Sequence, residues 1–456
     1  MAGITETKNR LPNEFVNNLY EMFTPGMVDN IFRGIAEKRL TTLRVNTLKY
    51  DIQSLMKYFK EINIKFERVL WYNDALIIKN ANEKDIQKLE IYQKGYIYLQ
   101  SLSSMVPPLV LNPKEGENVL DLTAAPGSKT TQIASLMNGK GHILANELDK
   151  LRCERLKYNV QSQGAEIVDV INGRGEKIGD LYPEQFDKVL LDTPCSGEGM
   201  FRKLEQAVDT WSEDKVLECA HIQKNLLKGA YDMLKQGGMV IYSTCTYSYE
   251  ENEAMVHYAV DELGFELLPL SKSHGLCPGV DLDEVVRCYP HHYRGEGHFI
   301  ALLRKPGNSP RKVVRPMKPQ VSQADLKVLK AFYQETLNKK VPAYIIENNG
   351  HLYAIKKNFP ELKGIRVLRN GLYLGEVRKN RFIPSYSLAL TLTKEDVKRS
   401  YDYSCDSEEI KKYIHGETLE GTGNKGFGVI FVDGYPLSFY KESNQVKNLF
   451  PKGLRR

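Results

Sequence analysis

The chain has 456 residues, which is enough for two to four domains, and its apolar fraction of 42% is enough to fill their cores. No apolar stretch approaches the ~18 residues of a membrane helix, and the N-terminus lacks a signal-peptide core, so we expect a soluble, cytoplasmic protein. The seven cysteines are widely spread and form no CxxC pair, which argues against a disulfide framework and a zinc site. A net charge of +6 is too mild to identify a nucleic-acid-binding protein by itself.

The N-terminal part of the chain is predicted to mix helices and short strands. Residues 14–60 carry mostly helical patterns, with one short break at RLTTLRVNTLKY (39–50). Residues 62–90 carry short strand and helix signals. We therefore expect an α+β region ahead of the main core.

From about residue 117 the pattern changes to strands that alternate with helices. Short apolar runs predict strands at 118–122, 141–149, 165–172, 186–193 and 238–245. Helical periodicity predicts helices at 128–138, 150–162, 213–236 and 249–263. This alternation is typical of a doubly wound α/β core with a parallel sheet and right-handed crossovers. Residues 298–305 predict a last strand, which is a candidate for an antiparallel one.

A basic, proline-bearing stretch follows this core. Residues 304–318 contain six basic side chains, three prolines and no acidic side chain, which predicts an inter-domain linker that can touch phosphate. After it, a helix is predicted at 323–337 and strands in 342–348, 351–357 and 365–379. From about residue 396 a smaller unit begins, with glycine-rich strands in 423–441.

The segment VLDLTAAPGSKT (119–130) predicts a ligand site after the first core strand. Its turn of small residues lets a ligand approach the backbone, and the helix that follows presents free amide donors. Glu147 comes twenty residues after Gly127, at the end of the next strand, where an acid can hold two ribose hydroxyls. The motif is neither GxGxxG nor a P-loop, so a nucleoside with an amino-acid tail, such as S-adenosylmethionine, fits it. An ordinary strand-to-helix turn is the alternative. Asn172, at the end of the third strand, is a candidate for an adenine contact or the start of an Asn-Gly turn.

Two cysteines and an aspartate come at the ends of the next two strands. Asp192 and Cys195 follow the fourth strand and Cys245 follows the fifth, and in a doubly wound sheet both ends face one crevice. A thiolate there can add to C6 of a pyrimidine, so that C5 can take a methyl group, while a carboxylic acid at N3 stabilises the developing charge. Lys129 is a candidate for the positive charge that favours a thiolate. Each cysteine alone could also be a small core residue. Four acid or amide side chains, residues 250–253, follow closely.

These segments resemble the motifs of a known family. LDTPCSGEG (191–199) and YSTCTYSYEENE (242–253), with VLDLTAAPGSKT upstream, are similar to those of the Nol/Nop/Sun family of RNA cytosine-5 methyltransferases. RVNTLK (44–49), the segment 95–122 and RCYPHHYRGEGHFIALL (287–303) resemble further motifs of that family. The resemblance covers residues 10–305. The remainder, through IHGETLE (414–420) and VKNLFPKGLRR (446–456), resembles the RsmF-like branch that acts on small-subunit ribosomal RNA.

The resemblance implies a fold and a division of the chain. The implied fold is a Rossmann-like, S-adenosylmethionine-dependent methyltransferase core with an N-terminal α+β extension and C-terminal α+β and PUA-like RNA-binding domains. The predicted domains are an N-terminal RNA-binding or lead-in domain (1–92), the methyltransferase domain (93–305), the basic linker (306–320), a middle α+β domain (321–395) and the PUA-like domain (396–456).

The resemblance also implies roles for single residues. Cys245 corresponds to the nucleophile that attacks C6, Cys195 to the cysteine that helps to release the product, and Asp192 to the acid near the target base. The residues that correspond to the S-adenosylmethionine site are Thr123, Ala124, Ala125, Pro126, Gly127, Ser128, Lys129, Glu147, Asn172 and Asp192. The chain departs from the family pattern at Thr123, Ser128, Thr193 and Asn172, where cysteine, glycine, alanine and aspartate are common.

The implied activity is methylation of cytosine C5 in RNA, above all 16S (small-subunit) ribosomal RNA, through a covalent Cys245–C6 adduct. The implied partner is RNA, without a membrane or a metal, and we expect a monomer. His291, His292 and His298 suggest a metal site, but their spacing fits no helix face and the family uses no metal, so none is assigned.

Other functions stay open at this point. The same chemistry could act on transfer RNA, large-subunit ribosomal RNA or DNA, and in a DNA cytosine methyltransferase Cys195 would be the nucleophile. A non-catalytic ribosome-assembly factor could keep a vestigial cofactor site. The complete set of Cys245, Cys195, Asp192 and Glu147 argues against that last reading.

Overall fold

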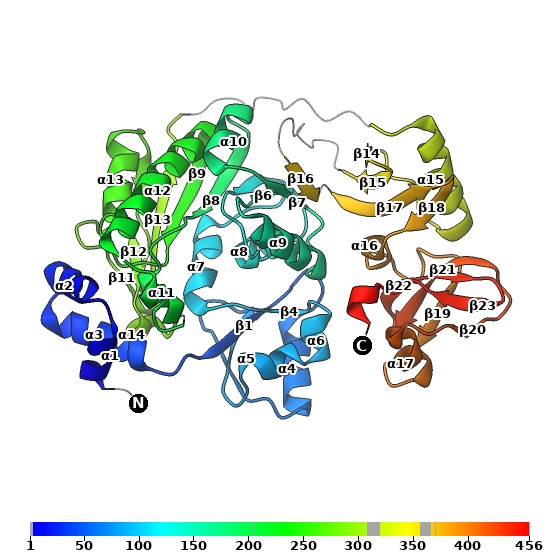
Figure 1. Cartoon of the computed structure of the whole chain (residues 1–456), viewed down its shortest axis with the longest axis horizontal. Helices are drawn as coiled ribbons and strands as arrows, with labels where there is room; N and C mark the ends of the chain where they lie inside the picture. The colour runs from blue at the N-terminus through cyan, green and yellow to red at the C-terminus, as the bar shows by residue number, and fades with distance from the viewer. Residues whose placement is uncertain (1–2, 204, 308–319, 356–365, 370, 456) are drawn as a thin grey trace. The chain divides into compact units, whose positions relative to one another are not determined.

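Two structural units make up the chain, and each is built around its own sheets (Figure 1). The computed structural model describes residues 3–203, 205–307, 320–355, 366–369 and 371–455. The first unit holds the elements from α1 to β13 and most of β16, and the second holds the rest. Most of the predicted linker lies outside the described residues, and the predicted domain boundaries stay predictions. In the described part of the chain, no helix is long and apolar enough to cross a membrane.

The first unit begins with helices around a small antiparallel sheet of strand order β2-β3-β1-β4. The predicted break at 39–50 contains β1, whose β-branched Thr41, Thr42 and Val45 favour an extended chain. The elements of this region are α1 (Ile4–Arg10), α2 (Asn13–Met22), α3 (Pro25–Ala36), β1 (Thr41–Val45), α4 (Ile52–Glu61), β2 (Phe66–Arg68), β3 (Ala75–Ile78), α5 (Glu83–Gln87), α6 (Glu90–Gln93), β4 (Ile97–Leu99) and α7 (Leu102–Leu111).

The main sheet confirms the predicted doubly wound α/β core. Its central strands run in the order β7-β6-β5-β8-β9 and are parallel, and β13 pairs antiparallel with β9 as the sequence suggested. The elements of the core are β5 (Asn118–Asp121), α8 (Ser128–Leu136), β6 (His142–Asn146), α9 (Lys150–Ser162), β7 (Val168–Asn172), α10 (Gly175–Leu181), β8 (Phe186–Asp192), η1 (Glu198–Met200), α11 (Glu205–Asp209), α12 (Glu213–Met233), β9 (Leu234–Thr244), α13 (Glu253–Asp261), β10 (Glu266–Leu268), η2 (Ser273–Gly275), β11 (Leu276–Cys277), β12 (Val286–Cys288), α14 (Pro290–Tyr293) and β13 (His298–Arg304).

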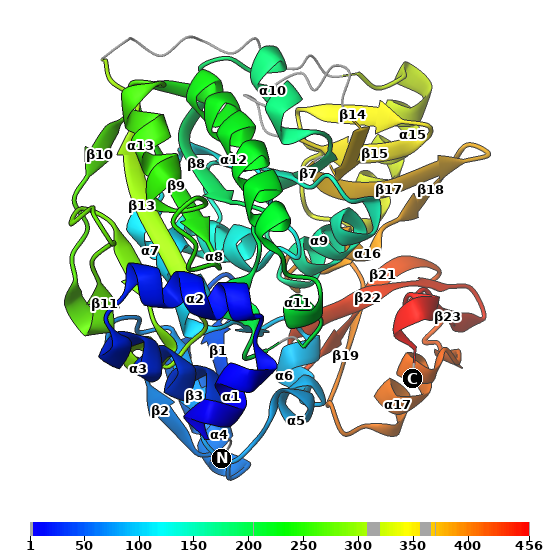
Figure 2. The same ribbon diagram turned by 60° about the vertical axis from the view of Figure 1, so that its left-hand side comes forward.

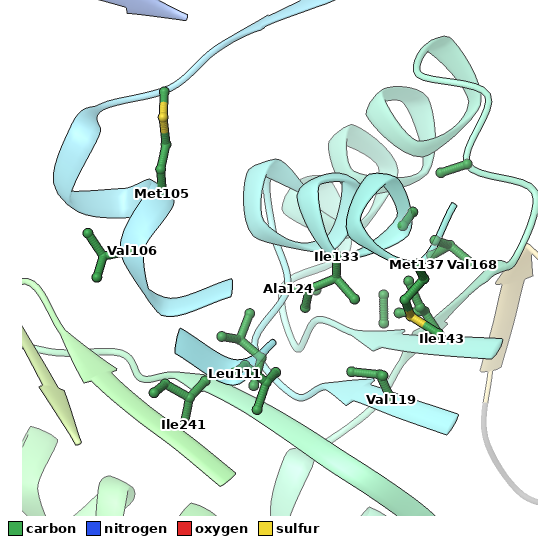
Figure 3. Close-up of a cluster of buried hydrophobic side chains, with 14 of the residues drawn as sticks. Met105, Val106, Leu111, Val119, Ala124, Ile133, Met137, Ile143, Val168 and Ile241 are labelled. Atoms are coloured by element: carbon green, nitrogen blue, oxygen red, sulfur yellow. The ribbon is translucent and has the colours of Figure 1, made fainter. Parts of the chain in front are cut away.

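Helices cover both faces of this sheet. Helices α8 and α9 lie on one face, and α10, α12 and α13 lie side by side on the other (Figures 1 and 2). A buried apolar cluster fills the space under α7 and α8 with side chains such as Met105, Ile133, Val119 and Ile143 (Figure 3). Burial of such side chains is the main stabilising contribution, at about 1.5–3 kcal/mol for each large one. The cluster therefore fixes α8, and with it the turn that precedes α8, against the strand ends.

The second unit holds two further sheets, of strand order β14-β15-β17-β18 and β19-β21-β22-β23-β20. The strand-like piece predicted at 365–379 is split between the units, because β16 lies at the edge of the main sheet beside β7. The elements here are α15 (Gln323–Thr336), β14 (Ile345–Asn348), β15 (His351–Ala354), β16 (Arg366–Arg369), β17 (Leu372–Arg378), β18 (Arg381–Pro384), α16 (Tyr386–Ala389), β19 (Ser400–Tyr403), α17 (Glu408–His415), β20 (Leu419–Glu420), β21 (Gly426–Val432), β22 (Tyr435–Glu442), β23 (Gln445–Asn448) and η3 (Lys452–Leu454).

Candidate active site

The strand order reverses direction between β5 and β8, and at such a switch point the loops on either side part to leave a crevice. The loop after β5 and the loop after β8 are tied together there, because the Thr123 hydroxyl donates to the main-chain carbonyl of Asp192 at 2.8 Å. The predicted cofactor turn and the predicted base-binding acid therefore lie at one place in the fold.

The turn from residue 123 to residue 127 brings a ligand close to the start of α8. Gly127 has a φ of +104°, and a Cβ there would meet the Leu156 side chain at 3.0 Å, so glycine is required on two counts. No side chain caps the first turn of α8, and the first amides of a helix have no acceptor within the helix. Those amides suit a carboxylate, such as the one on the methionine part of S-adenosylmethionine.

Acidic side chains end the strands around this turn. Asp121 is fully buried, burial raises its pKa to about 7, and its Oδ1 atom has no hydrogen-bond partner among the described residues. Glu147 is buried at the end of β6, where its Oε1 accepts from the Asp149 amide at 3.0 Å and its Oε2 lies 3.6 Å from Arg152. A ribose diol fits the Glu147 carboxylate at the end of β6.

The side-chain amide of Asn172 already donates within the protein, so it is not free to donate to an adenine. Its side-chain amide donates to the carbonyls of Glu147 at 2.7 Å and of Leu148 at 2.8 Å. Both donor hydrogens are therefore used to hold the chain beyond β6, and only the Oδ1 acceptor is left to face a ligand. The adenine contact of Asn172 stays a prediction.

Asp192 lies at the centre of a polar network at the end of β8. Lys129 Nζ contacts its Oδ2 at 2.6 Å, the Ser243 hydroxyl donates to its Oδ1 at 2.8 Å, and His298 Nε2 lies 3.8 Å from Oδ1. Burial alone would raise the pKa of Asp192, but Lys129 and His298 hold it well below its usual range. Asp192 is thus a carboxylate that accepts hydrogen bonds. The ion pair with Lys129 favours the ionised form of Asp192, and the role of Asp192 near the target base stays a prediction.

His298 also belongs to this network. From the sequence it was considered only as a metal ligand, and not as a residue near the target base. It begins β13, which pairs antiparallel with β9, so its ring reaches the crevice from the neighbouring strand. Its Nδ1 lies 3.1 Å from the Gly297 carbonyl and therefore carries a proton, and the side chain is buried. The metal reading of His291, His292 and His298 has no support here, since the described residues contain no group of three or more His, Cys, Asp or Glu side chains that could hold a metal.

The two predicted cysteines meet at the crevice. Their Sγ atoms lie 3.2 Å apart, and the Cys245 amide also lies 3.3 Å from the Cys195 sulfur. The hydrogen bond to Cys245 and burial raise the pKa of the Cys195 thiol well above its ordinary value. The raised pKa favours the protonated thiol at Cys195, and either sulfur can donate in the contact between them.

Further polar residues support the two cysteines from beneath. Ser196, Gln223, Thr246, Glu251 and Asn252 are buried and hydrogen-bonded around the two cysteine-bearing loops. The only signal for them in the sequence was the group of acid and amide side chains at 250–253. That signal did not say which of these side chains point inward.

Comparisons with known proteins agree with this geometry. Three family models match: 16S rRNA methyltransferase RsmB/F at residues 108–304, the first C-terminal domain of RsmF rRNA methyltransferase at 331–392, and the PUA domain of methyltransferase RsmF at 400–456. The third match confirms a PUA-like fold in the C-terminal region.

Similar full-length proteins are known in bacteria. The chain is 33% identical to Ribosomal RNA small subunit methyltransferase F of Vibrio vulnificus (strain YJ016), with 98% of each chain covered. It is 31% identical to the protein of the same name from Shewanella oneidensis, with 97% of this chain and 96% of that one covered.

Two solved structures that are similar to about two thirds of the chain are from Pyrococcus horikoshii. A methyltransferase homologue is 31% identical with a TM-score of 0.55, covering 65% of this chain and all of that one. NSun6, solved with the S-adenosylmethionine analogue SFG, is 26% identical with a TM-score of 0.60, covering 66% of this chain and all of that one.

Proposed function

The chain belongs to the RsmB/F family of 16S rRNA methyltransferases, and we propose that it methylates C5 of a cytosine in small-subunit ribosomal RNA through a covalent bond from Cys245 to C6. As a member of that family it is an S-adenosylmethionine-dependent methyltransferase. The observation that carries the proposal is the pair of sulfurs 3.2 Å apart next to the ion-paired Asp192. The substrate is supported by the name of the relatives in Vibrio vulnificus and Shewanella oneidensis.

The first step is addition of the Cys245 thiolate to the target base. The S–C6 bond forms, and the electron pair of the C5=C6 bond moves through C4 to N3. Asp192 is ionised, so it accepts a hydrogen bond from the exocyclic amino group of cytosine and does not supply a proton. The Lys129 ammonium, which is paired with Asp192, offsets the negative charge that forms on the ring.

The second half of the reaction takes the methyl group and releases the base. When bound, S-adenosylmethionine supplies an electrophilic methyl group, which C5 of the adduct accepts. A base then removes the C5 proton, the C5=C6 bond re-forms and Cys245 leaves as a thiolate. Cys195, which retains its proton, lies 3.2 Å from the departing sulfur and stabilises it by an S–H···S hydrogen bond.

The nucleic-acid partner reaches this site as an unstacked base. A pyrimidine ring inside a helix hides C6 and C5 from a nucleophile, so the target cytosine must leave its stack, which costs least in single-stranded or loop RNA. The PUA-like domain is the part of the chain to which we assign RNA binding outside the methyltransferase domain. We also propose that the protein acts in the cytoplasm, where bacterial ribosomes assemble.

The test is methyl transfer from labelled S-adenosylmethionine to small-subunit ribosomal RNA, both naked and assembled into subunits. Nucleoside analysis of the product should give 5-methylcytosine. Transfer to a different base or atom would contradict the proposal. Transfer to transfer RNA, large-subunit RNA or DNA, without transfer to small-subunit RNA, would contradict the substrate and keep the chemistry.

A further inference from the structure

The acid and amide side chains that follow Cys245, at residues 250–253, differ in their burial. Glu250 is exposed, whereas Glu251 and Asn252 are fully buried. Buried polar side chains need hydrogen-bond partners, and Glu251 and Asn252 find several of theirs in the residues that flank the two cysteines.

Asn252 holds the chain on both sides of Cys245. Its Oδ1 accepts from the Thr244 hydroxyl at 2.6 Å, and its Nδ2 donates to the Thr246 carbonyl at 3.1 Å. One planar amide therefore bridges the residue before and the residue after the nucleophile. The bridge fixes the direction in which the Cys245 side chain leaves the end of β9.

Glu251 and Gln223 hold the chain on both sides of Cys195. Glu251 accepts from the Ser196 amide at 3.0 Å, Gln223 donates to the Pro194 carbonyl at 2.9 Å, and Gln223 also donates to Glu251 at 2.9 Å. Pro194 and Ser196 are the two neighbours of Cys195. The Tyr242 hydroxyl, on β9, lies 2.9 Å from Gln223 Oε1 and also contacts the Glu251 carbonyl, and its one proton is shared between these two acceptors.

The two supports are joined to each other. Ser196 and Thr246, each the residue after a cysteine, share a hydrogen bond of 2.7 Å between their hydroxyls. Glu251 and Asn252 are also consecutive in the chain. A displacement of either side chain would therefore move one thiol relative to the other.

We propose that Glu251 and Asn252 are positioning residues that set the two thiols separately: Asn252 aims Cys245 at C6, and Glu251, with Gln223, places Cys195 for release of the product. This inference rests on the proposed covalent mechanism. Both side chains are fully buried, and each acts through the residues that flank a cysteine. A displacement of about 1 Å at a reacting group lowers a rate by about 100-fold, so small shifts are measurable.

The test separates formation of the RNA–protein adduct from its breakdown, in single-turnover experiments on the full chain. Asn252→Asp keeps the acceptor for Thr244 and loses the donor to Thr246, and should slow adduct formation by ~10-fold or more. Glu251→Gln should leave adduct formation near wild type and lengthen the adduct lifetime by ~10-fold or more. Both estimates follow from a displacement smaller than 1 Å.

Matched controls come from the same segment. Glu250→Gln makes the same change on the exposed neighbour and should alter neither phase. Thr244→Val removes the hydroxyl that Asn252 accepts and should slow adduct formation, whereas Thr244→Ser should restore it. Gln223→Met should reproduce the long-lived adduct of Glu251→Gln, which provides a second route if the charge change in Glu251→Gln prevents folding.

The outcomes separate this inference from the proposed function. Wild-type rates for both phases in Asn252→Asp and Glu251→Gln, or an equal slowing of both phases in both variants, would overturn the inference. If Cys245→Ala still forms 5-methylcytosine, the covalent mechanism itself fails. If Cys245→Ala is inactive and the positioning variants are normal, only the inference fails.

Discussion

The ends of β8 and β9 invite comparison, because two neighbouring parallel strands each deliver a cysteine to one crevice and the two cysteines are chemically unlike. At the end of β8, Cys195 keeps its proton, and the loop that carries it is held by the ionisable Glu251. At the end of β9, Cys245 is held by the neutral amide of Asn252. The difference comes from the neighbours and not from the residue type, so a cysteine at a strand end has no fixed role of its own.

Loss of the β9 thiol should have the largest effect. Cys245→Ala removes the nucleophile, and we expect methyl transfer to fall by more than about 10³-fold, as when other covalent nucleophiles are removed. Binding of S-adenosylmethionine should stay near wild type. Turnover close to wild type, or an adduct that maps to Cys195, would reverse the assignment of the two ends.

Loss of the β8 thiol should affect a different phase of the reaction. Cys195→Ala leaves Cys245 free to add but removes the proton that lies against it, so a covalent RNA–protein adduct should accumulate while turnover falls by about 10²-fold. The adduct is detected as a band that survives denaturing electrophoresis. An inactive variant without an adduct would show that Cys195 acts before addition.

Loss of the Lys129–Asp192 ion pair at the end of β8 should also reduce activity. In Lys129→Met the Asp192 carboxylate loses its strongest stabilising partner, so the pKa of Asp192 rises and the site loses a cation. We expect activity to fall by about 10²-fold. The loss should be larger at acidic pH, where Asp192 is still ionised in the wild type and is protonated in the variant. If the pH dependence of activity at acidic pH is the same in the variant and the wild type, Lys129 does not set the pKa of Asp192. Lys140→Met, at an exposed salt bridge on the same unit, is the matched control and should have little effect.

At the third strand end that borders the crevice, the effect should be on stability and not on rate. Burial raises the pKa of Asp121 to about 7, so its contribution to stability is present below its unfolded pKa and is lost as the pH rises toward 7. Asp121→Asn removes this titration and keeps an acceptor for the Thr130 hydroxyl. Between pH 5 and pH 8, the free energy of unfolding of the first unit should fall by about 3 kcal/mol more in the wild type than in the variant. Parallel pH profiles from denaturant unfolding would contradict the buried, protonated state of Asp121.

Much of the fold could be predicted because its pattern is local. The strands of the main sheet are short apolar runs separated by helical periods, and these identified β5, β6, β7, β8 and β13 to within a few residues. The start of β9 could not be predicted, since Gly237 and Gly238 look like a turn. In the fold, β9 begins at Leu234, which pairs with Phe186 before the register shifts. The strand β16 was missed as a separate element because its partner β7 lies far away in the sequence.

The site could be predicted as far as its motifs reach. Cys195, Cys245, Asp192 and Lys129 lie at one crevice because parallel strand ends meet there. What the motifs could not give is the direction of each side chain. Glu250 and Glu251 are the same residue type at adjacent positions, and only the packed structure shows that the second one points inward to Ser196.

The separation of the two sulfurs has a consequence for handling the protein. They lie 3.2 Å apart, and a disulfide bond is about 2.05 Å long, so a shift of about 1 Å would bring them within bonding distance. A peroxide that removes two electrons from the pair, with loss of the two thiol protons, would block both cysteines in one event. Activity should then disappear on mild oxidation and return with dithiothreitol. A reducing environment is therefore a condition for this site to work, and an assay without a reductant would measure the oxidation state of the pair more than the rate of the enzyme.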